Sequence, residues 1–160
     1  MPLPLRHIAA MVLTTRRRSQ PTCRLRHRVW PSYVDINLHM NHASYLEVME
    51  LARWHWCVER GVLAPWLRRG VRPVAIHQEV SYRRELKPMQ RFEVVTRLTR
   101  REGKAAIFTH RFVVGDRTHA EGACRFLLVR NRKVLDEGSV ADLLDDLIDE
   151  RDDTHEKGPA

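Results

Sequence analysis

Apolar residues recur at the spacing of one helix face between Ala43 and Arg60, a stretch without glycine or proline. Most other residues in this stretch are good helix formers, such as leucine, glutamate, methionine and alanine. Gly61 follows directly and is a residue type that commonly ends helices. The apolar positions are Tyr45, Leu46, Val48, Met49, Ala52 and Trp56. The pattern predicts one long helix, apolar over much of its surface, against which a sheet packs.

Alternating apolar and polar residues predict β-strands on both sides of this helix. Turn signals at 86–88, 101–104 and 115–116 separate the later strands, and Gly122 is expected to form a bulge. Consecutive strands joined by short turns are usually antiparallel neighbours. The predicted strands are 24–30, 74–82, 92–98, 106–114 and 120–129. We therefore predict an α+β protein in which an antiparallel sheet curls around one long central helix.

The two ends of the chain are expected to flank a single domain. Residues 3–14 are moderately apolar and precede three arginines, which favours a short helix that packs on the domain. This apolar run is too short to span a membrane, and its charges follow it, unlike those of a signal peptide. Near the other end, Ser139 is predicted to cap an amphipathic helix with apolar residues from Val140 to Ile148. The expected layout is a short helix and linker in 1–22, the domain in 23–150, and a tail in 151–160.

Composition and charge narrow the class of protein. The chain has 160 residues, 43% of them hydrophobic and 30% charged, as is typical of one globular cytoplasmic domain. Residues 136–160 hold ten acids and two bases, so the net charge of +8 divides into −8 there and +16 on residues 1–135. This basic body favours an anionic partner, although an arginine-rich surface alone would also account for it. Three cysteines without metal-ligand or disulfide spacing indicate a reducing compartment, and no metal or resident cofactor is expected.

A dense polar segment precedes the predicted helix, with Asp35, Asn37, His39, Asn41 and His42 inside eight residues. One interpretation is structural: Asp35 and Asn37 close an Asx-turn, and Asn41 caps the helix. The other is chemical, because the first amides of a helix carry partial positive charge and can stabilise a developing oxyanion. The Asp35 carboxylate would then act beside them as a base or a nucleophile.

The motif Trp30-Pro-x-x-x-Asp-x-Asn-x-His-Met-Asn-x-x-x-Tyr-Leu-x-x-x-Glu-x-Ala-Arg53 resembles the hotdog-fold acyl-CoA thioesterases. The similarity is to the 4-hydroxybenzoyl-CoA thioesterase-like superfamily, particularly the branch related to thioesterase superfamily member six, and it extends over residues 24–130. It implies a hotdog fold, an acyl-CoA substrate and a homodimer or larger oligomer, with coenzyme A as part of the substrate. The family commonly has glycine where this chain has Leu38, and a second asparagine where it has His42.

The resemblance also assigns catalytic roles. Asp35 would react, His39 and Asn41 would hold the loop, and amides near Asn41 to Ala43 would polarise the thioester carbonyl. Another branch of the superfamily uses a glutamate on the helix, so Glu50, with Glu47 beside it, is a secondary candidate. The structural alternative is that such a carboxylate pairs with Arg53 or Arg60 on the same helix.

Substrate contacts are expected on both sides of the helix start. Residues of the loop and the first helical turn would surround the thioester, and basic residues after the second strand would meet the coenzyme A phosphates. The residues concerned are Asn37, His42, Ala43, Tyr45, Arg83, Arg84 and Lys87.

Two other functions are compatible with this sequence. A hotdog-fold hydratase would carry Asp-x-Asn-Pro-x-His, whereas this chain has a motif one residue shorter and without the proline, Asp35-Ile-Asn-Leu-His39. A non-catalytic protein that binds acyl-CoA or a lipid surface would keep the fold without the chemistry. Specific nucleic-acid binding is not expected, because it needs exposed aromatic residues among the basic ones, and the aromatics here fall on faces expected to be buried.

Overall fold

The long helix predicted between Ala43 and Arg60 is helix α2, His42–Glu59. The structure is a computed structural model that describes residues 22–149. Its strands are β1 (Cys23–Arg28), β2 (Val71–Tyr82), β3 (Arg91–Glu102), β4 (Ala105–Val114), β5 (Arg117–Arg130) and β6 (Lys133–Val134). The other helices and 3-10 turns are η1 (Pro31–Tyr33), α3 (Leu63–Arg68), α4 (Glu137–Leu144) and η2 (Asp145–Leu147). The helix expected in residues 3–14 and the tail expected at 151–160 lie outside the described residues.

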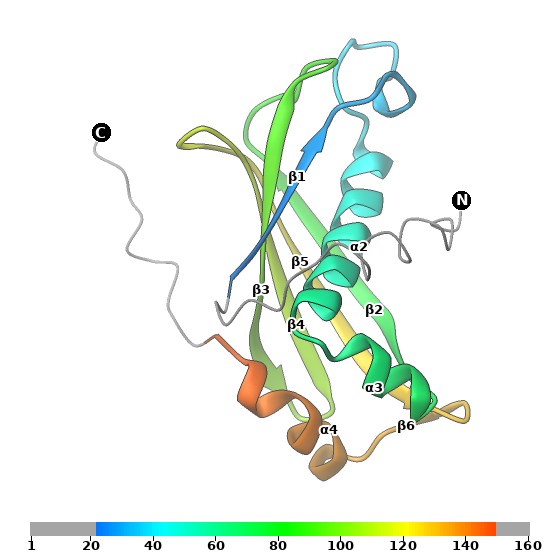
Figure 1. Cartoon of the computed structure of the whole chain (residues 1–160). Helices are drawn as coiled ribbons and strands as arrows, with labels where there is room; N and C mark the ends of the chain where they lie inside the picture. Colours follow the sequence, from blue (N-terminus) through cyan, green and yellow to red (C-terminus); the bar gives the residue numbers. More distant parts are fainter. Residues whose placement is uncertain (1–21, 150–160) are drawn as a thin grey trace.

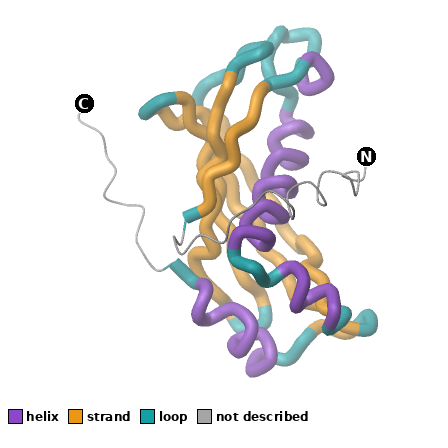
Figure 2. The backbone as a smooth tube through the Cα atoms, viewed as in Figure 1, coloured by secondary structure: helices purple, strands orange, loops and turns teal. Residues whose placement is uncertain are grey.

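The strands form one antiparallel sheet in the order β1-β3-β4-β5-β2, with the short β6 beside β5. The sheet curls around α2, which covers one of its faces along much of its length (Figures 1 and 2). Helices α3 and α4 lie at the end of the sheet away from the start of α2 (Figure 1). The predicted architecture, a curled antiparallel sheet around one long helix plus a C-terminal helix, is confirmed.

Strand β2 does not pair with the next strand along the chain, contrary to the expectation from short turns. It pairs with β5, from Val71 opposite Arg130 to Tyr82 opposite Ala120. The connection after β2 therefore crosses from one edge of the sheet to strand β3 near the other edge. Strand β2 is left as an edge strand, and most of its residues are exposed.

The apolar face of α2 packs on the sheet as predicted. Trp56 meets Phe108 with ring centroids 4.9 Å apart, and Tyr45 meets Phe112 at 5.0 Å. Leu46 is the exception, because 39% of its surface is exposed. The other predicted positions are at most 2% exposed, namely Tyr45, Val48, Met49, Ala52 and Trp56.

Gly122 makes room for the helix and does not form the predicted bulge. It keeps regular register with His110 on β4 and with Val80 on β2. A Cβ atom at Gly122 would lie 2.7 Å from the Met49 sulfur and 3.1 Å from the Glu79 carbonyl oxygen. The absence of a side chain therefore lets α2 approach the sheet closely.

Gly122→Ala is expected to lower the free energy of unfolding by about 1–3 kcal/mol, the usual cost of overpacking a core. Met49 is fully buried and the Glu79 oxygen belongs to the backbone, so neither can move away freely. Urea denaturation of the two proteins measures the effect. The matched control is Gly138→Ala in α4, where the nearest atom to a new Cβ is 3.4 Å away and alanine suits the helix. Equal stability of Gly122→Ala and the parent would contradict the close approach.

Helix α4 begins two residues before Ser139, and Asp136 is its N-cap in place of the predicted Ser139. The Asp136 carboxylate accepts hydrogen bonds from the Ser139 amide (2.9 Å) and hydroxyl (2.7 Å). These hydrogen bonds lower the pKa of Asp136. The helix ends at Leu144, and Arg101 on β3 binds the next residue, Asp145, at 2.8 Å.

All three cysteines, Cys23, Cys57 and Cys124, are buried and free. Cys57 belongs to the core. Among the helices of residues 22–149, none is long and apolar enough to cross a membrane. Location in the cytoplasm stays a prediction.

Candidate functional site

The polar segment before α2 folds into a tight turn (blue to cyan in Figure 1). Val34 and Met40 form an isolated antiparallel bridge at its base. Inside the turn, the Asp35 amide donates to the His39 carbonyl (3.2 Å), and the Leu38 amide donates to the Asp35 carbonyl (3.1 Å). Leu38 has a φ of +59°, a left-handed conformation that costs a residue with a Cβ about 1–2 kcal/mol. The turn thus keeps a glycine-like backbone with leucine in that place.

Asp35 is half-buried within this turn. Its Oδ1 accepts a hydrogen bond from the Asn37 amide at 2.8 Å, which is the Asx-turn of the structural interpretation. Within residues 22–149, Oδ2 has no hydrogen-bond partner. One oxygen of the carboxylate is therefore held in place while the other is open to a ligand.

Asn41 caps α2 as predicted. Its Oδ1 accepts a hydrogen bond from the Ser44 amide at 2.9 Å. Its side-chain Nδ2 and its backbone amide both donate to the Tyr33 carbonyl, at 3.0 and 2.8 Å. The Asn41 amide is therefore occupied, and the expectation that amides from Asn41 onward polarise a carbonyl is wrong for this first one.

The amides of His42 and Ala43 are the open donors at the helix start. Neither has an acceptor within the helix, neither donates to another group in the described part of the chain, and both residues are exposed. Partial positive charge collects at this end of α2. His39 lies just upstream, with Nδ1 3.2 Å from the Met40 carbonyl oxygen, which is consistent with a role in holding the loop.

The segment that follows β2 lies beside this loop. The Met40 amide donates to the Leu86 carbonyl at 2.8 Å. The ring of His42 stacks on Tyr82 at 4.5 Å, and Tyr45 meets the same ring edge-on at 5.0 Å. Burial raises the pKa of Tyr45 to about 12. Only 2% of the Tyr45 surface is exposed, so this side chain packs beneath the Tyr82 ring as part of the core. Tyr82, 45% exposed, is the surface residue that sequence reasoning missed, because its position depends on which edge β2 occupies.

The three cations expected to meet phosphates lie near this loop but are not equivalent. Arg83 is engaged with Glu121 on β5, through Nη2 and through Nε at 3.1 Å. Arg84 and Lys87 are exposed, and neither has an ion pair with another described residue. These two side chains are therefore the ones available to an anionic ligand.

Glu50 is not brought together with Asp35. It lies eight residues after His42, about 12 Å further along the helix axis, beside a cavity of about 130 Å³. Glu50 accepts a hydrogen bond from the Trp54 indole (3.4 Å), and Arg53 donates to Gln78 on β2 (3.4 Å), so the expected pairing of Glu50 with Arg53 is not the contact observed. The cavity is lined by Glu50, Arg53, Trp54, Cys57, Trp66, Pro73, Ala75, Gln78, Phe108 and Phe126.

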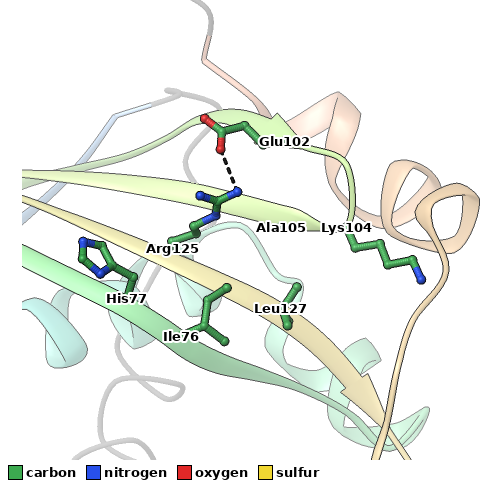
Figure 3. A pocket seen from close by; sticks show the side chains of 7 residues that line it. All are labelled: Ile76, His77, Glu102, Lys104, Ala105, Arg125 and Leu127. Carbon is green, nitrogen blue, oxygen red and sulfur yellow. Dashed lines mark ion pairs between the residues drawn. The ribbon is translucent and has the colours of Figure 1, made fainter.

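A wider hollow of about 670 Å³ lies on the other face of the sheet (Figure 3). Arg125 and Leu127 of β5 point into it, because they alternate with buried residues that face α2. Arg125 is paired there with Glu102 at 2.9 Å. None of the predicted site residues lines this hollow, so the candidate site is the loop at the start of α2.

A curled antiparallel sheet wrapped around one long helix is the hotdog fold, and this defines the class of protein. The family model of the thioesterase-like superfamily matches residues 29–147, which include the whole candidate loop and α2. The chain belongs to this superfamily. Membership of the narrower branch related to thioesterase superfamily member six stays a prediction.

Solved structures share this fold at low sequence identity. The probable thioesterase YbaW from Escherichia coli is 21% identical, with a TM-score of 0.72 over 79% of this chain and 98% of that one. DHNA-CoA thioesterase from Staphylococcus aureus is 12% identical, with a TM-score of 0.68 over 78% and 85% of the two chains. The hypothetical protein SAV2348 from Staphylococcus aureus, solved in complex with CoA, is 14% identical, with a TM-score of 0.68 over 79% and 83%.

Proposed function

We propose that this protein is an acyl-CoA thioesterase, which hydrolyses a thioester to a carboxylic acid and coenzyme A. The observation that carries the proposal is an open carboxylate oxygen on Asp35 in the loop that leads into two open amides, those of His42 and Ala43. Membership of the superfamily supports the reaction class. The two Staphylococcus aureus proteins of the same fold, one a CoA thioesterase and one bound to CoA, support the substrate class.

In this mechanism the thioester carbonyl oxygen points at the amides of His42 and Ala43. Asp35 takes a proton from a water molecule, whose oxygen attacks the carbonyl carbon, or its carboxylate attacks that carbon directly. The amides stabilise the negative charge that develops on the carbonyl oxygen. Collapse of the tetrahedral intermediate breaks the carbon–sulfur bond, and the departing thiolate takes up a proton. On the direct route, water then hydrolyses the mixed anhydride on Asp35 and releases the acid.

Product identity separates this proposal from the hydratase and the non-catalytic binder. Mass spectrometry of an acyl-CoA and its enoyl-CoA analogue after incubation with the protein is expected to show free acid and free CoA. A product 18 Da heavier than the enoyl-CoA, with the thioester intact, would identify a hydratase. Unchanged acyl-CoA that co-elutes with the protein would identify a binder.

The exposed cations Arg84 and Lys87 are proposed to contact the phosphates of coenzyme A. Replacing both with alanine is expected to raise KM about two- to tenfold and leave kcat nearly unchanged, since an exposed ion pair contributes about 0.2–1 kcal/mol. Added salt should weaken binding in the parent more than in the double variant. Initial rates against substrate concentration at low and high salt measure both effects. The matched control replaces Arg132 and Lys133 with alanine, two residues that are exposed in the β5–β6 hairpin, and it should leave KM unchanged. An unchanged KM in Arg84→Ala/Lys87→Ala would contradict the assignment of these two cations.

The protein is also proposed to be a homodimer joined through strand β2. This edge strand is 12 residues long and exposes Val74 by 45% and Ile76 by 50%. Long edge strands with exposed apolar residues are normally covered. The candidate loop is similarly open, since 96% of Ile36 and 73% of Leu38 are exposed. A second copy paired at this edge would cover part of the exposed loop at the start of α2 and so enclose the candidate site on one more side.

Light scattering of the full chain at micromolar concentration is expected to give about twice the monomer mass of 18.8 kDa. Ile76→Lys places a charge on the β2 edge and should shift the mass toward the monomer. Leu67→Lys is the control, because Leu67 is similarly exposed (56%) but lies on α3. A mass near 18.8 kDa for the unsubstituted protein would contradict the dimer.

A further inference from the structure

A second cluster of reactive side chains lies where β1 meets the C-terminal half of α2. The Cys23 sulfur on β1 is 2.9 Å from Nδ1 of His55 on α2. Glu59 follows His55 by four residues and so lies on the same face of the helix. Cys23 is 1% exposed and His55 is half-buried, so the cluster lies at the border between the core and the surface.

The ligand atoms of this cluster fit one metal ion. The Cys23 sulfur, a His55 ring nitrogen and a Glu59 carboxylate oxygen all lie within 4.8 Å of one another. In a tetrahedral zinc site, bond lengths of 2.0–2.3 Å place the ligand atoms about 3.3–3.6 Å apart. The Cys23 sulfur and the His55 nitrogen, which lie 2.9 Å apart, would separate slightly on binding, and side-chain rotation would bring the Glu59 oxygen to the same spacing. We propose that Cys23, His55 and Glu59 form a binding site for a divalent cation of the zinc type.

The choice of zinc follows from the donors. Thiolate and imidazole ligands select zinc and its neighbours in the transition series, whereas magnesium and calcium prefer oxygen ligands alone. Three protein ligands leave a fourth position for water. Coordination converts the Cys23 thiol to a thiolate and releases its proton to solvent.

Two of the three ligands are anionic when they bind a metal, namely the Cys23 thiolate and the Glu59 carboxylate. A bound divalent cation would compensate both negative charges. Arg60 follows Glu59 directly in the chain, and its positive charge would lower the affinity for a metal.

This site is distinct from the candidate active site. His55 lies thirteen positions after His42, which corresponds to about 20 Å along the helix axis. A metal here would not reach a thioester at the Asp35 loop. It would fasten β1, the strand at one edge of the sheet, to α2. We therefore assign it a structural role that does not depend on the thioesterase proposal.

The test uses the full chain, freed of metal by a chelator and titrated with Zn²⁺ against a chromophoric competitor. One Zn²⁺ per chain is expected. Cys23→Ala and His55→Gln should each weaken binding by at least about 100-fold, because losing a ligand exceeds the 10–100-fold cost of losing an outer partner. Glu59→Gln should weaken binding less. Zn²⁺ should raise the Tm of the parent and not that of Cys23→Ala.

Two matched controls, Cys124→Ala and His77→Ala, remove a cysteine and a histidine elsewhere and should bind Zn²⁺ as the parent does. Co²⁺ bound to the unsubstituted protein should show thiolate-to-metal absorption in the near ultraviolet, a readout that holds even if a variant fails to fold. The site is overturned if that absorption is absent, if the parent does not bind Zn²⁺ stoichiometrically, or if Cys23→Ala retains parental affinity. Loss of binding in either control would also overturn it.

Discussion

Asp35→Asn is expected to lower the rate of acyl-CoA hydrolysis by about 10²–10⁴-fold, the usual cost of losing a general base or nucleophile. Asparagine keeps the shape of aspartate, and its carbonyl oxygen can accept the hydrogen bond from the Asn37 amide that closes the turn. The loop should therefore fold as before while the chemistry is lost. Steady-state kinetics with the best acyl-CoA substrate measure the effect, and melting temperatures within a few degrees of the parent exclude unfolding as its cause.

Glu50→Gln is the control for Asp35→Asn. Glu50 is also a carboxylate on the surface of this domain, but it lies beside a separate cavity and bonds to the Trp54 indole. Its substitution should change the rate at most a few-fold. Near-parental activity of Asp35→Asn would reduce Asp35 to a turn residue. An inactive Glu50→Gln beside an active Asp35→Asn would move the catalytic carboxylate to the helix.

Trp56→Ala is expected to lower the free energy of unfolding by about 3–5 kcal/mol, the range for large aromatic residues in cores. Trp56 is completely buried and packs edge-on against Phe108 at 4.9 Å. Its indole Nε1 has no hydrogen-bond partner in the described part of the chain, so the loss reflects packing and the Arg60 guanidinium, 5.7 Å from the ring centroid. A domain of this size is typically stable by about 5–15 kcal/mol, and the variant should therefore show a large shift of its urea midpoint.

Trp30→Ala is the matched control for this loss. Trp30 is 48% exposed and contacts the Arg28 guanidinium at 5.7 Å, an interaction that contributes about 0.5–1 kcal/mol at exposed sites. Its substitution should cost no more than that. Similar losses for Trp30→Ala and Trp56→Ala would contradict a core centred on the face of α2 that packs on β4.

The features that the sequence predicted correctly depend on near neighbours in the chain. The extent of α2 follows from its apolar spacing and from Gly61, which has a φ of +68°. The Asn41 cap and the Asx-turn of Asp35 are bonds to amides two or three residues away. Local side-chain chemistry determines such contacts without reference to the rest of the fold.

The features that the sequence could not predict depend on partners far along the chain. Pairing of β2 with β5 decides where Tyr82 lies and brings Gln78 to Arg53. The predicted bulge at Gly122 is wrong because the glycine instead leaves space for Met49 on α2, which lies 73 positions earlier in the chain. The Cys23–His55 contact joins residues 32 positions apart, so no local spacing signals it. Alternation along one strand carries no information about which strand lies beside it.

The candidate site combines both kinds of information. The motif from Asp35 to Asn41 identified the loop. Which hydrogen-bond donors near it are already occupied could be determined only from the fold. The Tyr33 carbonyl occupies the Asn41 amide, and Glu121 occupies Arg83. The groups left open are the Asp35 carboxylate oxygen, the amides of His42 and Ala43, and the side chains of Arg84 and Lys87. This is a smaller group than the sequence suggested.

Release of free CoA thiol from a panel of acyl-CoA substrates tests the central claim most directly. The panel should include short, long and aromatic acyl groups, each assayed with purified protein and with buffer alone. We expect at least one thioester to be cleaved over many turnovers, at an initial rate proportional to protein concentration. No thiol release above the buffer control for any member of the panel would contradict the assignment of this protein as a thioesterase.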